Sequence, residues 1–114
     1  MVEIILRQKG GPARHYHYNQ DEWFYILEGE FLIEAGLERF RLKPGDSLFV
    51  PRKMPHVWAF VGQRQGRFLA SVSPAGKLEA FFLNASQKNL LPGPEQTLWR
   101  PYDMEWVGPP LLVE

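Results

Sequence analysis

Residues 10 to 29 read GGPARHYHYNQDEWFYILEG, a turn of glycine and proline followed by two short segments that suit β-strands. Aromatic and β-branched side chains favour extended backbone, so we predict strands over residues 14–18 and 22–27. Side chains alternate faces along a strand, and His15 and His17 therefore project to the same side while Tyr16 projects to the other. Glu22 opens the second strand and is placed to reach the same point as the two histidines.

The strand pattern continues along the chain, where ten glycines and ten prolines interrupt short apolar segments. Glycine and proline at such short intervals favour many short β-strands joined by turns. The further predicted strands cover residues 2–7, 30–34, 38–42, 47–50, 56–61 and 67–73. Leu78, Phe81 and Phe82 follow helical spacing and predict a short amphipathic helix over residues 77–84. Five of the ten prolines lie beyond residue 90, which predicts an extended tail over residues 90–114, laid on the surface.

The length of 114 residues suits a single domain with its own core. Seven or eight short strands that close on themselves favour an all-β jelly roll or barrel over an open sheet. We therefore predict one domain over residues 1–114, with a core over about residues 10–73, the short C-terminal helix and the tail.

Composition excludes several classes of function. Acidic and basic side chains balance at 13 each, so neither nucleic acid nor a membrane surface is expected as a partner. The absence of cysteine removes disulfide frameworks, thiolate zinc sites and cysteine nucleophiles, and it suits a cytoplasmic location. The N-terminal residues lack the pattern of a signal peptide, and no apolar run approaches the length of a membrane span.

His56 lies far from the other two histidines in sequence, after a proline-containing turn at residues 51–55. Closing a barrel brings this side chain inward, beside His15, His17 and Glu22. Neutral imidazoles and a carboxylate suit a first-row divalent metal ion, so we predict one ion bound by these four residues, with open positions for chemistry. Mn, Fe, Co, Ni, Cu and Zn all suit this donor set. The alternative is a solvated polar strand face and a structural histidine.

Two spacings resemble the motifs of the cupin superfamily. The spacing G-x4-H-x-H-x4-E-x6-G from Gly10 to Gly29 is similar to the first cupin motif, although its first glycine sits one residue closer to the histidines. The spacing G-x5-P-x-K-x2-H-x3-F from Gly45 to Phe60 is similar to the second, with Lys53 in place of a glycine and Phe60 in place of an asparagine. The resemblance implies a double-stranded β-helix with the four residues above as metal ligands.

The surroundings of the predicted metal come from strand alternation. Side chains on the faces of Glu22 and His56 are apolar and aromatic, which predicts a substrate pocket lined by Phe24, Ile26, Phe49, Trp58, Phe60 and Phe68. The alternative is that these side chains only fill the barrel.

The runs at residues 22–29 and 73–82 resemble small quercetin 2,3-dioxygenase-like cupins. This resemblance implies a metal-dependent dioxygenase that acts on a small enolic or aromatic molecule, with Glu22 as both ligand and general base. A non-catalytic module that binds a small ligand, a structural metalloprotein and a metal-dependent isomerase remain alternatives, because this fold serves many functions.

A homodimer is also predicted. The first strand is apolar on both faces, with Ile4 on one and Ile5 on the other, and such strands are usually buried on both sides. Trp23, Tyr25 and Leu27 point outward and offer a second apolar surface. The competing interpretation is that the C-terminal tail folds back and covers these residues within one chain.

Overall fold

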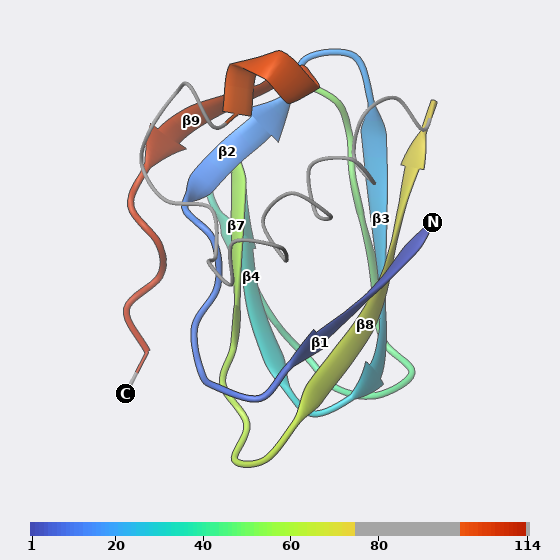
Figure 1. Cartoon of the computed structure of the whole chain (residues 1–114), viewed down its shortest axis with the longest axis vertical. Helices are drawn as coiled ribbons and strands as arrows, with labels where there is room; N and C mark the ends of the chain where they lie inside the picture. Colours follow the sequence, from blue (N-terminus) through green and yellow to red (C-terminus); the bar gives the residue numbers. More distant parts are fainter. Residues whose placement is uncertain (75–98, 114) are drawn as a thin grey trace.

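The computed structural model describes residues 1–74 and 99–113 and contains two antiparallel sheets that face each other (Figure 1). The four-stranded sheet has the order β1-β8-β3-β6, and the five-stranded sheet has the order β5-β4-β7-β2-β9. Among the described residues, no helix is long and apolar enough to cross a membrane. The strands are β1 Val2–Leu6, β2 Arg14–His17, β3 Asp21–Glu28, β4 Phe31–Ala35, β5 Glu38–Leu42, β6 Ser47–Val50, β7 His56–Phe60, β8 Gly66–Ser73 and β9 Met104–Gly108.

The strands from β1 to β8 confirm the predicted all-β fold, and their ends agree with the predicted ends to within one residue. The turn between β5 and β6 shows why the local sequence was sufficient to predict where these strands end and begin. The backbone N–H of Asp46 donates to the carbonyl of Lys43 at 2.9 Å, and Gly45 between them has a φ of 93°. Glycine adopts that conformation without a steric penalty, so this turn is specified by its own residues.

The core lies between the two sheets and is dominated by aromatic side chains. Phe68 is at its centre, with ring centroids 4.8 Å from Trp58, 5.2 Å from Phe31 and 5.6 Å from Phe24. Ile26 and Phe60 are buried in the same cluster. The predicted inward face of these side chains is therefore confirmed, and their mutual packing stabilises the fold by burying large aromatic surfaces.

The prediction that Phe49 lines the interior is wrong, since its side chain is 59% exposed on the outer face of the four-stranded sheet. In the register of β3 with β6, Phe49 is opposite Trp23, and Val50 is opposite Glu22. Residues directly opposite each other in antiparallel strands share a face. Because Glu22 points inward, Val50 must point inward as well, and Phe49 joins Trp23 outside.

Lys53, which takes the place of a glycine in the second motif, has a backbone conformation that glycine adopts readily. Its φ is 65°, in the left-handed region that side chains other than glycine seldom adopt. The backbone N–H of Lys53 donates to the carbonyl of His17 at 2.7 Å, which ties this loop to β2. The loop therefore holds a residue other than glycine in a conformation that costs free energy.

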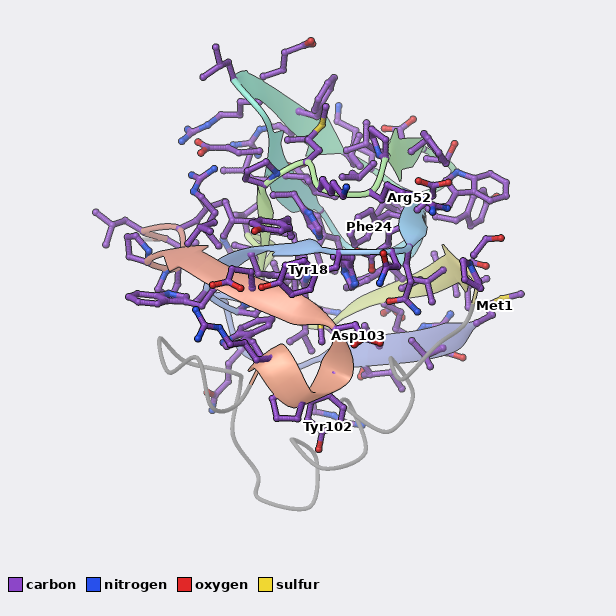
Figure 2. The ribbon with its side chains drawn as sticks, turned by 90° about the horizontal axis from the view of Figure 1, so that it is seen from above. Met1, Tyr18, Phe24, Arg52, Tyr102 and Asp103 are labelled. Carbon is purple, nitrogen blue, oxygen red and sulfur yellow. The ribbon has the colours of Figure 1, made fainter. Side chains whose placement is uncertain are left out.

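Residues 99–108 of the predicted C-terminal tail are not an extended surface segment, whereas residues 109–113 have no regular structure and are exposed or half-buried. Trp99 and Met104 are buried, a 3-10 turn spans Arg100–Tyr102, and β9 pairs with β2. Figure 2 shows β9 beside β2, with Tyr18 and Asp103 at their adjoining ends. The sequence of β9 has no strong alternation of apolar and polar residues. Its strand conformation therefore depends on pairing with β2 rather than on a local pattern. The predicted helix over residues 77–84 and residues 90–98 of the tail lie outside the described residues.

Candidate metal centre

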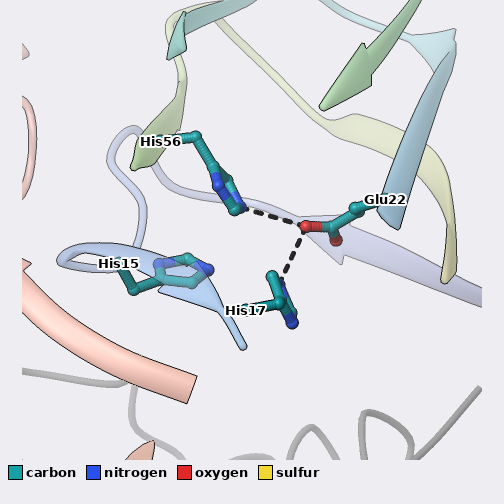
Figure 3. Close-up of side chains that lie close together, drawn as sticks. All are labelled: His15, His17, Glu22 and His56. Atoms are coloured by element: carbon teal, nitrogen blue, oxygen red, sulfur yellow. Dashed lines mark hydrogen bonds and ion pairs between the residues drawn. The ribbon is translucent and has the colours of Figure 1, made fainter. Parts of the chain in front are cut away.

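Four buried side chains from three strands converge between the sheets (Figure 3). β2 contributes His15 and His17, which alternation places on the same face, β3 contributes Glu22 and β7 contributes His56. His15 is directly opposite His56 in the pairing of β2 with β7. One ligand atom from each of the four residues lies within 4.8 Å of the others, and no side chain in the group is more than 6% exposed. The structure therefore brings together all four residues predicted as metal ligands.

The Nδ1 atom of each histidine is close to an oxygen acceptor. It lies 2.8 Å from the carbonyl of Ala13 for His15, 3.3 Å from Oε1 of Gln20 for His17 and 3.1 Å from the carbonyl of Met54 for His56. An oxygen acceptor at Nδ1 favours the tautomer that carries its proton there and leaves the lone pair on Nε2. All three rings are thus held in the form that binds a metal through Nε2.

Glu22 lies at the point where the Nε2 atoms meet. Its Oε1 is 3.0 Å from Nε2 of His56 and 3.0 Å from Nε2 of His17. The second approach lacks hydrogen-bond alignment, so the buried Nε2 of His17 has no hydrogen-bond partner among the described residues. A buried polar atom without a partner is costly, and a metal ion at this point would satisfy it. The donor set therefore fits a divalent metal ion.

The pKa values of the site residues reflect burial and mutual contact. Burial, followed by the neighbouring His56 and His17, holds the pKa of His15 well below its usual value. Burial raises the pKa of the Glu22 carboxyl, but its close contacts with His17 and His56 outweigh this effect and leave the pKa well below its usual range. Burial also lowers the pKa of His17, whereas its contacts with Glu22 and Gln20 raise it overall. Glu22 is therefore an anion and His15 a neutral imidazole at neutral pH, the forms that ligate metals.

Comparison with known proteins places this architecture in a family. The model of the cupin domain matches residues 2–72, which is more than half of the chain and includes all four converging side chains. The chain belongs to the cupin domain family. The fold and the cluster are thus those of a cupin with a complete candidate metal site.

Similar proteins include an uncharacterised protein of Methanocaldococcus jannaschii, 45% identical over 49% of this cupin and 45% of the relative. A Streptomyces cyaneus protein named polyketide synthase CurC is 30% identical over 61% of this chain and 46% of its own. This cupin therefore spans less than half the length of these relatives. A solved cupin from Bacteroides fragilis has a TM-score of 0.54 at 22% identity, covering 61% of this chain and 59% of that one, which supports the fold alone.

Of the residues predicted to line a pocket, Phe24 contacts the cupin's candidate metal site directly, with its ring centroid 6.0 Å from that of His56. Trp58, Phe60 and Phe68 lie deeper, among the core aromatic rings. Their role in binding a substrate remains a prediction.

Two residues near the site were missed from sequence. Gln20 looked like part of a polar turn but is buried beside His17, and its amide also donates to the carbonyl of Pro74 at 2.9 Å. Trp99 lay in the predicted tail but stacks on His15. Neither has a local signal, because both reach the site through long-range packing.

Proposed function

We propose that this cupin binds one divalent transition metal ion through His15, His17, Glu22 and His56 and uses it in a dioxygenase-type oxidation of a small enolic or aromatic molecule. The convergence of three Nε2 atoms and one carboxylate, with one of the nitrogens buried and unsatisfied, is the observation that supports the proposal most strongly. Three imidazoles and a carboxylate suit Fe, Mn, Co, Ni, Cu or Zn.

A redox-active metal bound here would supply Lewis acidity toward an enolate oxygen and a route for electrons to O2. The protein residues supply the rest. The Nδ1 contacts orient the imidazoles, and the surrounding aromatic side chains exclude water. Glu22 is ionised at neutral pH, as a general base must be, and we propose that it accepts the hydroxyl proton of an enol bound at this site.

The apolar surroundings support a small, largely apolar substrate anchored by one or two oxygen atoms. The relative named as a polyketide synthase protein adds to this inference, because polyketide chains are rich in β-dicarbonyl groups that enolise. A sugar isomerase would need several polar groups around its substrate, whereas Gln20 is the only buried polar side chain besides the four candidate ligands among the described residues.

The test is O2 uptake by protein reconstituted separately with Fe, Mn, Co, Ni, Cu or Zn, offered enols, flavonols and β-diketones. Turnover is expected with at least one metal and one enolic compound, and it should disappear in Glu22→Gln. Asp21→Asn is the matched control, since it removes the adjacent exposed carboxylate and should leave turnover intact. Metal and ligand binding without O2 uptake would favour a non-catalytic binding module instead.

Acid is expected to release the metal. Imidazoles bind only when neutral, and their ordinary pKa is about 6.5, so protons compete increasingly as the pH falls below that value. The raised pKa of His17 favours protonation of its ring as the pH falls, whereas the lowered pKa of His15 delays protonation of that ring. Equilibrium dialysis across this range measures the bound metal. Full retention at about pH 4 would contradict ligation by histidine.

We propose further that two copies of the chain pair through the outer face of the four-stranded sheet. This face exposes the side chains of Ile5, Trp23, Tyr25 and Phe49, at 47%, 52%, 40% and 59%. Large apolar side chains gathered on one exposed face of a soluble protein often mark an interface. The described residues of the tail extend the other sheet through β9, so they do not replace a partner here.

Sedimentation velocity at micromolar concentration tests the dimer. A particle of about twice the chain mass of 13.3 kDa is expected, and Phe49→Ser should shift it toward the monomer without unfolding it, because that side chain is mostly exposed. A wild-type particle at the monomer mass would refute the pairing.

A further inference from the structure

Trp99 is a fully buried side chain at 0% exposure, and it lies beyond residues 2–72, the part of the chain that the cupin family model matches. Its ring is stacked on the imidazole of His15, with centroids 4.4 Å apart and planes 30° apart. The C-terminal segment therefore reaches the candidate metal centre and covers one of its ligands.

The backbone of the same segment supports the strand that carries two of the ligands. β2 has a single register pair with β7, between His15 and His56, but it pairs with β9 along all four of its residues. The N–H of Tyr18 continues this contact by donating to the carbonyl of Asp103 at 3.0 Å. The position of β2 thus depends largely on residues outside the matched part of the chain.

Stacking of Trp99 on His15 restricts the tilt of the imidazole ring. The contact from Nδ1 to the carbonyl of Ala13 fixes where one edge of the ring points, and the His56 ring lies beside it with centroids 4.5 Å apart, but neither contact covers the face on which Trp99 stacks. An aromatic face packed on the imidazole restricts that tilt and keeps water from that face. His17 is held differently, through the side chain of Gln20, and His56 through the carbonyl of Met54.

We propose that Trp99 is a positioning residue, which orients His15 for metal binding by stacking on its ring. This inference rests on the proposed metal site. On this proposal the C-terminal segment contributes to metal binding. Loss of the Trp99 indole would leave all four ligands in the chain but would let the His15 ring move.

Trp99→Leu and Trp99→Phe test this role, with Trp106→Leu as the matched control. Trp106 lies in β9 directly opposite His15 and is partly buried, but no ring contact joins it to a histidine among the described residues, so its loss disturbs β9 without removing the stacked ring. The measurements are Co2+ affinity by titration calorimetry, the visible absorption spectrum of the Co2+-saturated protein, and the melting temperature of each metal-free variant.

Trp99→Leu is expected to lower the Co2+ affinity by about 10- to 100-fold, as is typical when a group that orients a ligand is lost, and to change the spectrum at saturation. Trp99→Phe should recover most of the affinity and the wild-type spectrum, because a ring is again stacked on His15. Trp106→Leu should keep the wild-type affinity and spectrum.

The inference is overturned if Trp99→Leu binds Co2+ as the wild type does, or if Trp106→Leu loses as much affinity, since general loosening of β9 would then be the cause. Should Trp99→Leu fail to fold, Trp99→Phe and Trp99→Tyr remain informative, because a spectrum that differs from the wild type in both would contradict ring stacking as the cause. A wild-type protein that binds neither Co2+ nor any other divalent ion would remove the proposed metal site itself, which is a distinct result.

Discussion

Addition of a divalent transition metal ion to the metal-free protein is expected to raise its free energy of unfolding by about 4 kcal/mol when the free ion exceeds Kd a thousandfold. The reason is that the folded chain assembles His15, His17, Glu22 and His56 within 4.8 Å, whereas the unfolded chain keeps them apart. For a domain of this size the melting temperature should rise by on the order of 10–20 °C. Differential scanning calorimetry in chelator, and then in excess metal, measures the shift.

His56→Ala should remove most of this shift, because Nε2 of His56 is one of the three converging nitrogens. The variant should also be less stable than the wild type without metal, since the buried Glu22 carboxylate loses its contact with Nε2 of His56. Asp21→Asn, which alters an exposed carboxylate paired with Arg52, should keep the full shift. An equal metal-induced shift in His56→Ala would show that the ion binds elsewhere.

Gly11→Ala is expected to destabilise the fold by on the order of 3 kcal/mol, the upper part of the usual range for overpacking. A Cβ atom at Gly11 would lie 2.0 Å from the carbonyl oxygen of Trp58 and 3.1 Å from Cα of Ala59. Both are backbone atoms of β7, so no side-chain rotation relieves the clash. The strand itself must move, and His56 is its first residue. The metal affinity should therefore fall together with the stability.

Chemical denaturation of the metal-free protein measures the loss, and Gly108→Ala provides the control. A Cβ atom at Gly108 would approach nothing closer than the side chain of Arg14, at 3.4 Å, which is ordinary contact. The effect of Gly108→Ala on stability should be small. The comparison is a close one, because Gly11 lies just before β2 and Gly108 ends β9, which pairs with β2. A free energy of unfolding for Gly11→Ala within about 0.5 kcal/mol of the wild-type value would contradict this prediction, because it would mean that β7 moves aside at almost no cost.

Local patterns were sufficient for the parts of the fold that depend on neighbours in sequence. The alternation of apolar side chains correctly placed Phe24 and Ile26 inside, and the spacing of His15 and His17 correctly placed both imidazoles on one face. The same reasoning failed for Phe49, because a strand of four residues has too short a pattern to show which face is buried. Its pairing with β3 decided the face instead.

The sequence by itself determined the strand order along the chain, the Gly45 turn and the kinds of ligand atom available, because backbone geometry and side-chain chemistry are local properties. Only the tertiary structure decided that His56 meets the other ligands, that Gln20 and the carbonyls of Ala13 and Met54 contact the Nδ1 atoms, and that Trp99 covers His15. These contacts join residues through the pairing of β2 with β7 and β9 and through packing between the sheets. Register between distant strands is set by burial summed over whole faces, so no single stretch of sequence contains it.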